Sequence, residues 1–182
     1  LSLISVEQAR ANLIREVGDR SYRSVLRLAR KRWASQFDKV RIEASEEVKT
    51  IFYTALYHSL LYPRKIDEYG RYYSAFDDSV HNGVMYNCWS MWDTYRAEHP
   101  LLTLVAPEHI DGMMQSLVEM FKEGGWLPKW PNPSYTGIMV GSPAETILAE
   151  AWTKGFRGFD VEQAYAAVRK NATVPQDGDR DN

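Results

Sequence analysis

The chain has 182 residues, of which 45% are apolar, enough to bury the core of one ordinary domain and to exclude disorder over most of its length. Its formal charge is −2, with 22 Lys and Arg against 24 Asp and Glu, so no overall field favours nucleic acid, and we find no stretch that would span a membrane. A single cysteine, Cys88, excludes an internal disulfide and a metal site made of cysteines alone.

The chain begins with a short alternating run and two expected helices. Residues 1–4 fit the last strand of something upstream. Ser5 and Gln8 form a capping-box pattern, which predicts a helix as far as Val17. A second helix is expected over residues 21–37. We interpret its basic side chains as a solvated face, because the stacking aromatic residues of a nucleic-acid site do not flank them. These basic residues are Arg20, Arg23, Arg27, Arg30, Lys31 and Arg32.

The clearest helix is expected over residues 45–61, before Pro63. Its apolar residues follow one stripe, which we expect to be buried. The stripe consists of Val48, Ile51, Phe52, Ala55, Leu56, Ser59 and Leu60. Short Tyr-rich runs then follow over residues 66–89, punctuated by Gly70 and Gly83, and predict a small hairpin or a pair of ordered loops.

Helices return in the second half of the chain. We expect them over residues 89–98, 107–122, 143–154 and 160–170. Their signals include a Met pair interpreted as core, Ser142 and Asp160 as N-caps, and His99 fixing a helix exit before Pro100. The Met pair is Met113 and Met114.

The stretch WSMWDTYR crowds aromatic rings beside charges. In a helix Trp92 and Arg96 are four residues apart, and Asp93 and Arg96 are three apart. An aromatic plane beside a fixed charge suits a sugar, whose ring has apolar faces and directed hydroxyls. A surface ion pair between Asp93 and Arg96, with the tryptophans in the core, explains the stretch equally well.

A second aromatic segment, GGWLPKWPNPSYTG, carries Trp126, Trp130 and Tyr135 among three prolines. These rings predict either a preorganised binding wall or a lid over helix ends. The adjacent Asp77 and Asp78, near His81, suggest neither an acid and base pair nor a calcium loop, because neighbouring side chains point apart. The histidines form no metal motif, and the chain has no nucleophile elbow, P-loop or dinucleotide fingerprint.

Five segments of the chain together resemble one known family. The sequence is similar to the catalytic region of glycoside hydrolase family 92, the calcium-dependent exo-acting α-mannosidases, over nearly its whole length. The segments are IFYTALYHSLLYP, GRYYSAFDD, WSMWDTYRAEHPLLTLVAPE, MMQSLVEMFKEGGWLPKWPNPSYTGIMVG and AYAAVRKNA.

The resemblance implies a fold and an activity. The expected fold class is all-α, an incomplete (α/α)6 barrel preceded by a helical linker and the last strand of a β-sandwich domain. Residues 1–44 would be the end of the sandwich domain and the linker, and residues 45–182 the first part of the barrel. Family members hydrolyse α-mannosidic bonds with inversion, using a glutamate as acid, an aspartate as base and calcium. Inversion needs carboxyl groups about 6.5–9.5 Å apart.

This chain departs from the family pattern at the catalytic carboxylates. The acid is expected in a segment resembling EGNAWQY and the base in one resembling GNDD, and neither string occurs. Both, with most calcium ligands, are expected downstream of Asn182, so the chain alone should be inactive. Asp93, in the WDT motif, is the best candidate for a substrate hydroxyl contact, with Trp92, Arg96 and Trp130 as further candidates.

The resemblance also implies partners and a location. The partners are mannose-containing glycans and the remainder of the enzyme's own barrel and N-terminal domain, and the location is periplasmic or secreted. A partial barrel should leave a contiguous apolar surface larger than a monomer usually shows. Two alternatives stay open: a non-catalytic helical carbohydrate-binding module, in which Trp92, Trp126 and Trp130 hold a glycan, and a scaffold whose aromatic residues are all core.

Overall fold

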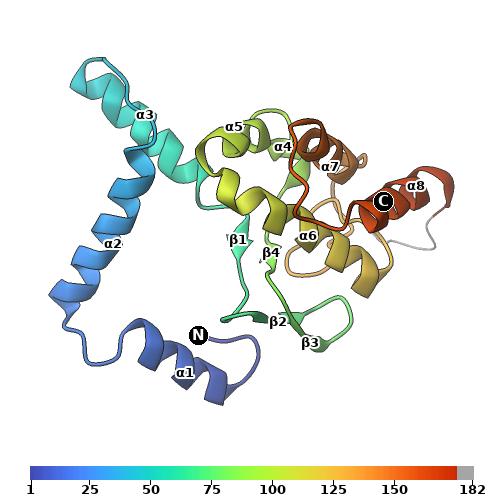
Figure 1. Ribbon diagram of the computed structural model, residues 1–182, viewed down its shortest axis with the longest axis horizontal. Helices are drawn as coiled ribbons and strands as arrows, with labels where there is room; N and C mark the ends of the chain where they lie inside the picture. The colour runs from blue at the N-terminus through green and yellow to red at the C-terminus, as the bar shows by residue number, and fades with distance from the viewer. Residues whose placement is uncertain (176–182) are drawn as a thin grey trace. The chain divides into compact units, whose positions relative to one another are not determined.

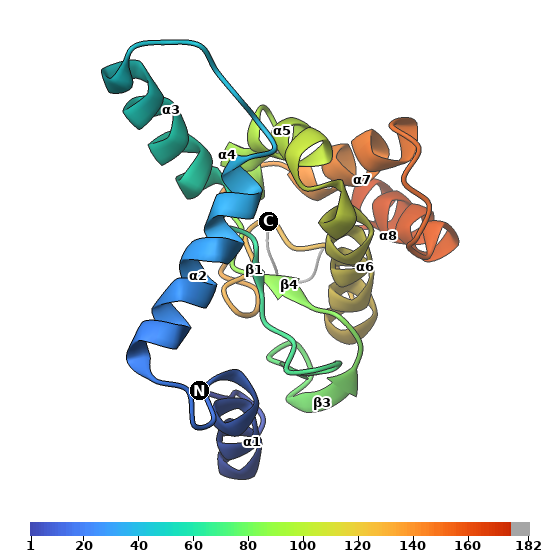
Figure 2. The ribbon, with the colours of Figure 1, turned by 60° about the vertical axis from the view of Figure 1, so that its left-hand side comes forward.

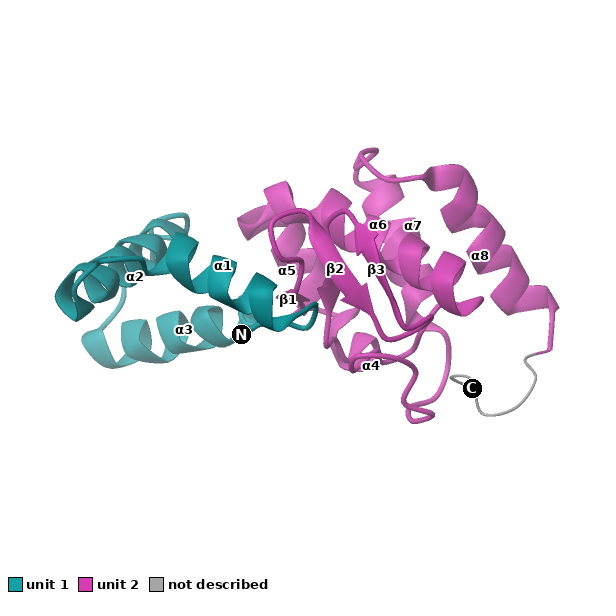
Figure 3. Ribbon diagram, turned by 90° about the horizontal axis from the view of Figure 1, so that it is seen from below, with its two compact units in different colours: residues 1–61 teal, residues 62–182 magenta. Residues whose placement is uncertain are grey.

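The computed structural model describes residues 1–175 of the chain (Figure 1). The chain forms two compact units, residues 1–61 and residues 62–182 (Figure 3). None of the helices in the described part is long and apolar enough to cross a membrane.

Unit 1 consists of α1 (Val6–Glu16), α2 (Tyr22–Phe37) and α3 (Glu46–Ser59). Each helix begins after a serine whose hydroxyl oxygen accepts a hydrogen bond from a backbone N–H three residues on. These N–H groups have no partner inside the helix, so the serine stabilises the first turn. All three expected helices are confirmed. The capping box at Ser5 is only half formed, because the Gln8 side chain donates to Asn12 instead.

Aromatic rings join α2 to α3. Trp33 packs on Tyr57 with ring centroids 4.6 Å apart, and the Tyr53 hydroxyl donates to the carbonyl of Val40 at 2.9 Å. The predicted burial of the whole α3 stripe is wrong: Leu56 is buried, but Val48 is 49% exposed and Ile51 64%. Within unit 1 one neighbouring helix, α2, packs against α3, and it covers only part of an apolar face.

Two further expectations concern the start of unit 1. Residues 1–4 form no strand, and the backbone N–H of Ile4 donates to the Ser2 hydroxyl within a local turn. A strand needs hydrogen bonds from a neighbouring strand, so the assignment of this segment to a sandwich domain stays a prediction. The basic side chains of α2 are exposed, as the solvated-face interpretation requires.

Unit 2 opens with two short antiparallel strand pairs. Strand β1 (Arg64–Lys65) pairs with β4 (Tyr86–Asn87), and β2 (Arg71–Ser74) pairs with β3 (Ser79–Asn82). The predicted hairpin is confirmed. Its tight turn lies at residues 75–78, while the two glycines meet at its base, where the N–H of Gly83 donates to the carbonyl of Gly70.

The rest of unit 2 is helical: α4 (Met91–Thr94), α5 (Glu98–Val105), α6 (Pro107–Gly124), α7 (Pro143–Thr153) and α8 (Val161–Thr173). Helix α6 is central, contacting α5, α7, α8 and β4 (Figures 1 and 2). Its buried side chains are Ile110, Met113, Met114, Ser116, Leu117, Val118 and Met120. The Met pair is therefore core, as predicted, and Gly125, with φ of 90°, ends the helix in the left-handed conformation that glycine tolerates.

Residues 89–98 do not form the expected helix. Only α4 forms there, and α5 starts at Glu98, so His99 and Pro100 lie in the first turn of a helix rather than at an exit. Proline is tolerated in a first turn because the N–H it lacks would have no partner inside the helix. His99 is buried, 2% exposed.

The two N-caps expected in the second half of the chain differ. The Asp160 carboxylate accepts from the N–H of Gln163 at 3.0 Å, which confirms that cap. Ser142 takes the N-cap position and Pro143 begins α7, as predicted, but the Ser142 side chain makes no capping hydrogen bond.

The observed fold is rich in helix with few short strands, which agrees with a helical class. The (α/α)6 barrel itself and the division of the parent protein at residue 44 stay predictions. By compactness α3 belongs with α1 and α2 rather than with the later helices.

Candidate functional site

The candidate site is built on the single turn of α4. The backbone N–H groups of Asp93 and Thr94 donate to the carbonyl of Ser90 at 3.0 and 3.1 Å, which closes the turn. Met91 and Thr94 point into the core, whereas Trp92 and Asp93 are exposed. A single turn anchored by its buried side therefore presents an aromatic ring and a carboxylate on the surface of unit 2.

Asp93 is held by Ser90. The Ser90 hydroxyl donates to Asp93 Oδ2 at 2.5 Å. Within the described part of the chain Asp93 makes no ion pair with Arg96, so the surface pair weighed from the sequence is not formed. The Ser90 hydroxyl, a neutral donor, therefore holds one of the two carboxylate oxygens of Asp93.

Arg96 instead stabilises the aromatic rings of the same turn. Its guanidinium lies 4.4 Å from the centroid of the Trp92 ring and 4.5 Å from that of Tyr95, and its Nη1 donates to the Trp92 carbonyl at 2.7 Å. Such cation–π contacts contribute roughly 0.5–1 kcal/mol at exposed sites. Trp92 and Arg96 are therefore neighbours, as predicted, and the guanidinium packs on the Trp92 ring.

The proline-rich segment after α6 is more structural than expected. Trp126 is only 7% exposed, and the Tyr135 hydroxyl accepts from its backbone N–H and donates to its carbonyl, at 2.9 and 2.7 Å. The Lys170 ammonium lies 4.3 Å from the centroid of the Trp126 ring. Trp126 is therefore a core residue, held through its backbone by the Tyr135 hydroxyl. The prediction that it forms part of an exposed binding wall is wrong.

Trp130 is half-buried, and its carbonyl accepts from the Thr136 hydroxyl at 2.8 Å. No hydrogen bond or ring contact among residues 1–175 joins it to Trp92, Asp93 or Arg96. The loop reaches α4 at another point, since a side-chain carbon placed at Gly141 would lie 3.6 Å from the Trp92 ring. The structure places Trp92 and Asp93 on α4, Arg96 two residues after its end, and Trp130 on the segment between α6 and α7.

Buried polar groups behind α4 were missed by the sequence analysis. Four side-chain atoms there are buried without a hydrogen-bond partner: Trp89 Nε1, Thr94 Oγ1, Glu98 Oε1 and His99 Nε2. Burial raises the pKa of Glu98 to about 7 and lowers that of His99 to about 4. The density of polar residues between 89 and 99 was the available signal, but it does not reveal which side chains point inward.

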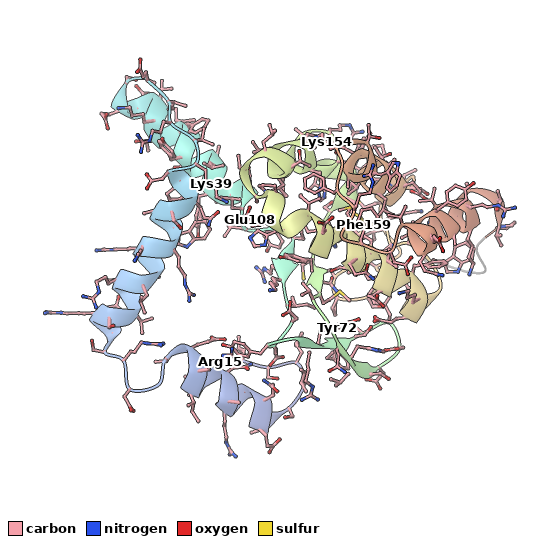
Figure 4. The ribbon with its side chains drawn as sticks, viewed as in Figure 1. Arg15, Lys39, Tyr72, Glu108, Lys154 and Phe159 are labelled. Atoms are coloured by element: carbon pink, nitrogen blue, oxygen red, sulfur yellow. The ribbon has the colours of Figure 1, made fainter. Side chains whose placement is uncertain are left out.

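The hairpin carries a separate group of charges. His81 Nε2 lies 2.9 Å from a carboxylate oxygen of Asp77, while Asp78 accepts from the Tyr73 hydroxyl at 2.8 Å. The two adjacent aspartates thus point to different partners, as expected. Tyr72, labelled in Figure 4, donates from its hydroxyl to the carboxylate of Glu123 at the end of α6, which ties the hairpin to that helix.

The described residues give no evidence of a metal-binding site. Within residues 1–175 no group of three or more His, Cys, Asp or Glu side chains is arranged to hold an ion. None of residues 1–175 is therefore assigned to calcium.

Comparison with known proteins decides the family. The family model described as the glycosyl hydrolase family 92 catalytic domain matches residues 8–182. The chain belongs to glycosyl hydrolase family 92. The comparison with curated protein sequences gives no match.

Solved structures of the family agree with this fold. An inverting mannosidase of family 92 from Bacteroides thetaiotaomicron VPI-5482 is 36% identical, with a TM-score of 0.92 over 97% of this chain and 25% of its own. An α-mannosidase of the family from Bacteroides thetaiotaomicron is 28% identical, with a TM-score of 0.91 over 96% of this chain and 24% of its own. That α-mannosidase is also known in complex with mannoimidazole. This chain spans about a quarter of the length of these relatives.

Proposed function

We propose that the complete protein is an α-mannosidase that hydrolyses terminal α-mannosidic bonds of glycans with inversion. The observation that carries this proposal is the family match, together with a TM-score of 0.92 to an inverting mannosidase over nearly all of this chain. The mannoimidazole complex of a second relative supports a mannose-type ligand.

We assign this chain to the part of the enzyme that holds the sugar. Asp93 is exposed and carries a carboxylate oxygen free to accept from a sugar hydroxyl, and Trp92 beside it offers an aromatic plane for a sugar face. Arg96 supports that plane from its own side of the ring. Trp130 would extend the wall from the adjoining segment.

The catalytic acid and base are proposed to lie outside this chain. Neither the EGNAWQY-like nor the GNDD-like string is present in the sequence, so the chain alone is proposed to be inactive. Calcium is proposed for the complete enzyme with its ligands mostly elsewhere. The mannose-containing substrate and a periplasmic or secreted location belong to the same proposal.

One assay tests the enzyme directly. The complete polypeptide is incubated with an aryl α-mannoside, with and without EDTA, and mannose release is measured while the anomer first formed is followed by NMR. We expect release of the β-anomer, abolished by EDTA and restored by calcium. Full activity in EDTA would overturn the calcium proposal, and release of the α-anomer would overturn inversion.

The same substrate separates the enzyme from a binding module. A complete polypeptide that quenches its tryptophan fluorescence with mannose but releases none would favour the carbohydrate-binding module. Neither quenching nor release would favour a scaffold. The Asp93→Ala variant is the matched test of the site, and a loss of kcat/KM of about 10-fold to 100-fold is expected from one charge-assisted hydrogen bond.

A further inference from the structure

Ser90 stands where a helix N-cap stands but does not act as one. A serine before a helix usually accepts a hydrogen bond from a backbone N–H in the first turn. Ser45 does so from Val48 at 3.4 Å, as do the serines before α1 and α2. Ser90 makes no such bond, and its hydroxyl donates instead to Asp93 Oδ2. The Ser90 hydroxyl therefore donates to the Asp93 carboxylate and does not cap a backbone N–H of α4.

This contact fixes the direction of an exposed carboxylate. Asp93 would otherwise turn freely at the surface, and ordering it on binding would cost conformational entropy. With Oδ2 held by the Ser90 hydroxyl, Oδ1 remains available to accept from a ligand. The turn itself is closed by backbone hydrogen bonds to the Ser90 carbonyl, so the hydroxyl is not needed to form it.

Arg96 leaves the carboxylate available as well. Its guanidinium is committed to the Trp92 carbonyl and to the Trp92 and Tyr95 rings. A guanidinium paired with Asp93 would occupy both carboxylate oxygens in a fork and compete with a sugar hydroxyl. The Ser90 hydroxyl thus donates to Oδ2 of Asp93, while the Arg96 guanidinium stays on the Trp92 and Tyr95 rings.

We propose that Ser90 is a positioning residue for Asp93, holding Oδ2 so that Oδ1 accepts from one hydroxyl of the mannose ring. This inference rests on the proposed function. The inference goes beyond the proposed function because Ser90 itself does not contact the sugar. It also assigns the two oxygens of Asp93 to different donors, Oδ2 to the Ser90 hydroxyl and Oδ1 to a hydroxyl of the substrate.

The test uses the complete enzyme and steady-state kinetics on an aryl α-mannoside and on analogues that each lack one ring hydroxyl. The variants are S90A, S90T, D93A and the double variant S90A/D93A. S90A is expected to lower kcat/KM about 5-fold to 10-fold, as the loss of one positioning hydrogen bond. S90T keeps the hydroxyl and is expected to recover most of that loss.

Two readouts separate positioning from a general structural role. In the D93A background the S90A substitution is expected to change kcat/KM by less than about 2-fold, because the group it positions is gone. The S90A penalty is also expected to disappear for the one analogue that lacks the hydroxyl bound by Asp93. Ser45→Ala, which removes a true N-cap serine in unit 1, is the matched control and should leave kcat/KM unchanged.

Each outcome has one meaning. An S90A enzyme with wild-type kinetics beside an impaired D93A enzyme would overturn the role of Ser90 and leave the proposed sugar contact intact. An S90A penalty of equal size with and without Asp93 would also overturn it, in favour of a structural role. Wild-type kinetics of D93A would overturn the sugar contact itself. If S90A does not fold, as judged by circular dichroism, Ser90→Cys keeps the size with a weaker donor and replaces it.

Discussion

The two units of the chain rely on different sources of helix stability. In unit 1 every helix begins at a capping serine, yet Leu56 is the only apolar side chain buried among its residues. In unit 2 helix α6 alone buries seven side chains, and Phe159, which precedes α8, packs among the helices (Figure 4). The serines before α4 and α7 make no capping bond. Capping serines mark every helix of unit 1, whereas the helices of unit 2, of which α8 keeps an N-cap at Asp160, also bury a core.

A matched pair of isoleucines tests this comparison with the largest expected effect. Ile147 is 2% exposed in unit 2 and Ile51 is 64% exposed in unit 1. Ile147→Ala should lower the free energy of unfolding by about 2–5 kcal/mol, because it leaves a cavity, and Ile51→Ala should change it by less than about 0.5 kcal/mol. Urea denaturation of the 182-residue chain at several concentrations measures both. Equal losses would show that Ile51 is covered in the folded chain, for example by self-association.

The buried polar groups of unit 2 predict a stability maximum near weakly acidic pH. Burial raises the pKa of Glu98 from 4.5 to about 7, so the folded state loses stability as the pH rises from 4.5 through 7. Burial lowers the pKa of His99 from 6.5 to about 4, so stability is also lost as the pH falls from 6.5 through 4. Between about pH 4.5 and 6.5 the loss from Glu98 and the gain from His99 largely cancel, so the two groups together predict a shallow stability maximum over that range.

Glu98→Gln isolates the alkaline half of that profile. It removes the buried charge, and after allowance for partial exposure it should stabilise the chain by about 1–2 kcal/mol at pH 8, with little effect at pH 4.5. Urea midpoints of wild type and variant at both pH values measure this. A variant equally shifted at both would contradict burial of the charge as the cause.

The serines sharpen the comparison with a smaller effect. Ser45→Ala removes a true cap and should lower the free energy of unfolding by about 1 kcal/mol, with a loss of helical circular dichroism from α3. Ser90→Ala, whose hydroxyl caps no backbone group, should change it by less than about 0.5 kcal/mol. The reverse order would mean that Ser90 supports the α4 turn after all.

Cys88 gives a test that is measured by the reactivity of its thiol rather than by stability. Burial raises the pKa of its thiol, and the nearby Arg64 lowers it in part. The thiolate is the reactive form, so Cys88 should react with a disulfide reagent at pH 8 more slowly than free cysteine, and Arg64→Ala should slow it further. The reaction is followed by absorbance. A faster reaction in the variant would mean that Arg64 shields the thiol instead.

The sequence predicts most elements because their signals are local. Apolar spacing, Ser45 and Gly125 defined α3 and α6, and their ends lie within a few residues of those expected. The prediction of one helix over residues 89–98 was wrong because the core decides which of its side chains are buried. Trp89 and Met91 are buried, and the chain forms the single turn α4 before α5 begins at Glu98.

The candidate site shows the same division. Family membership is readable from the order of residues, while the roles of Asp93 and Trp92 of the WDT motif stay predictions. The sequence left open an ion pair between Asp93 and Arg96, because Arg96 stands at the right spacing for one; the structure shows Arg96 on the Trp92 ring instead. Trp126 likewise could not be told from an exposed ring until the Tyr135 hydroxyl was seen to hold its backbone.

By itself the sequence determined the family and most of the helices, because these depend on residue identity and short-range spacing. The structure decided which apolar stripes are covered, which aromatic rings are core and that Ser90 rather than Arg96 holds Asp93. Burial arises from contacts between segments far apart in the chain, which local spacing does not encode. The choice between Ser90 and Arg96 is local, but both stand three residues from Asp93, so spacing alone does not decide it.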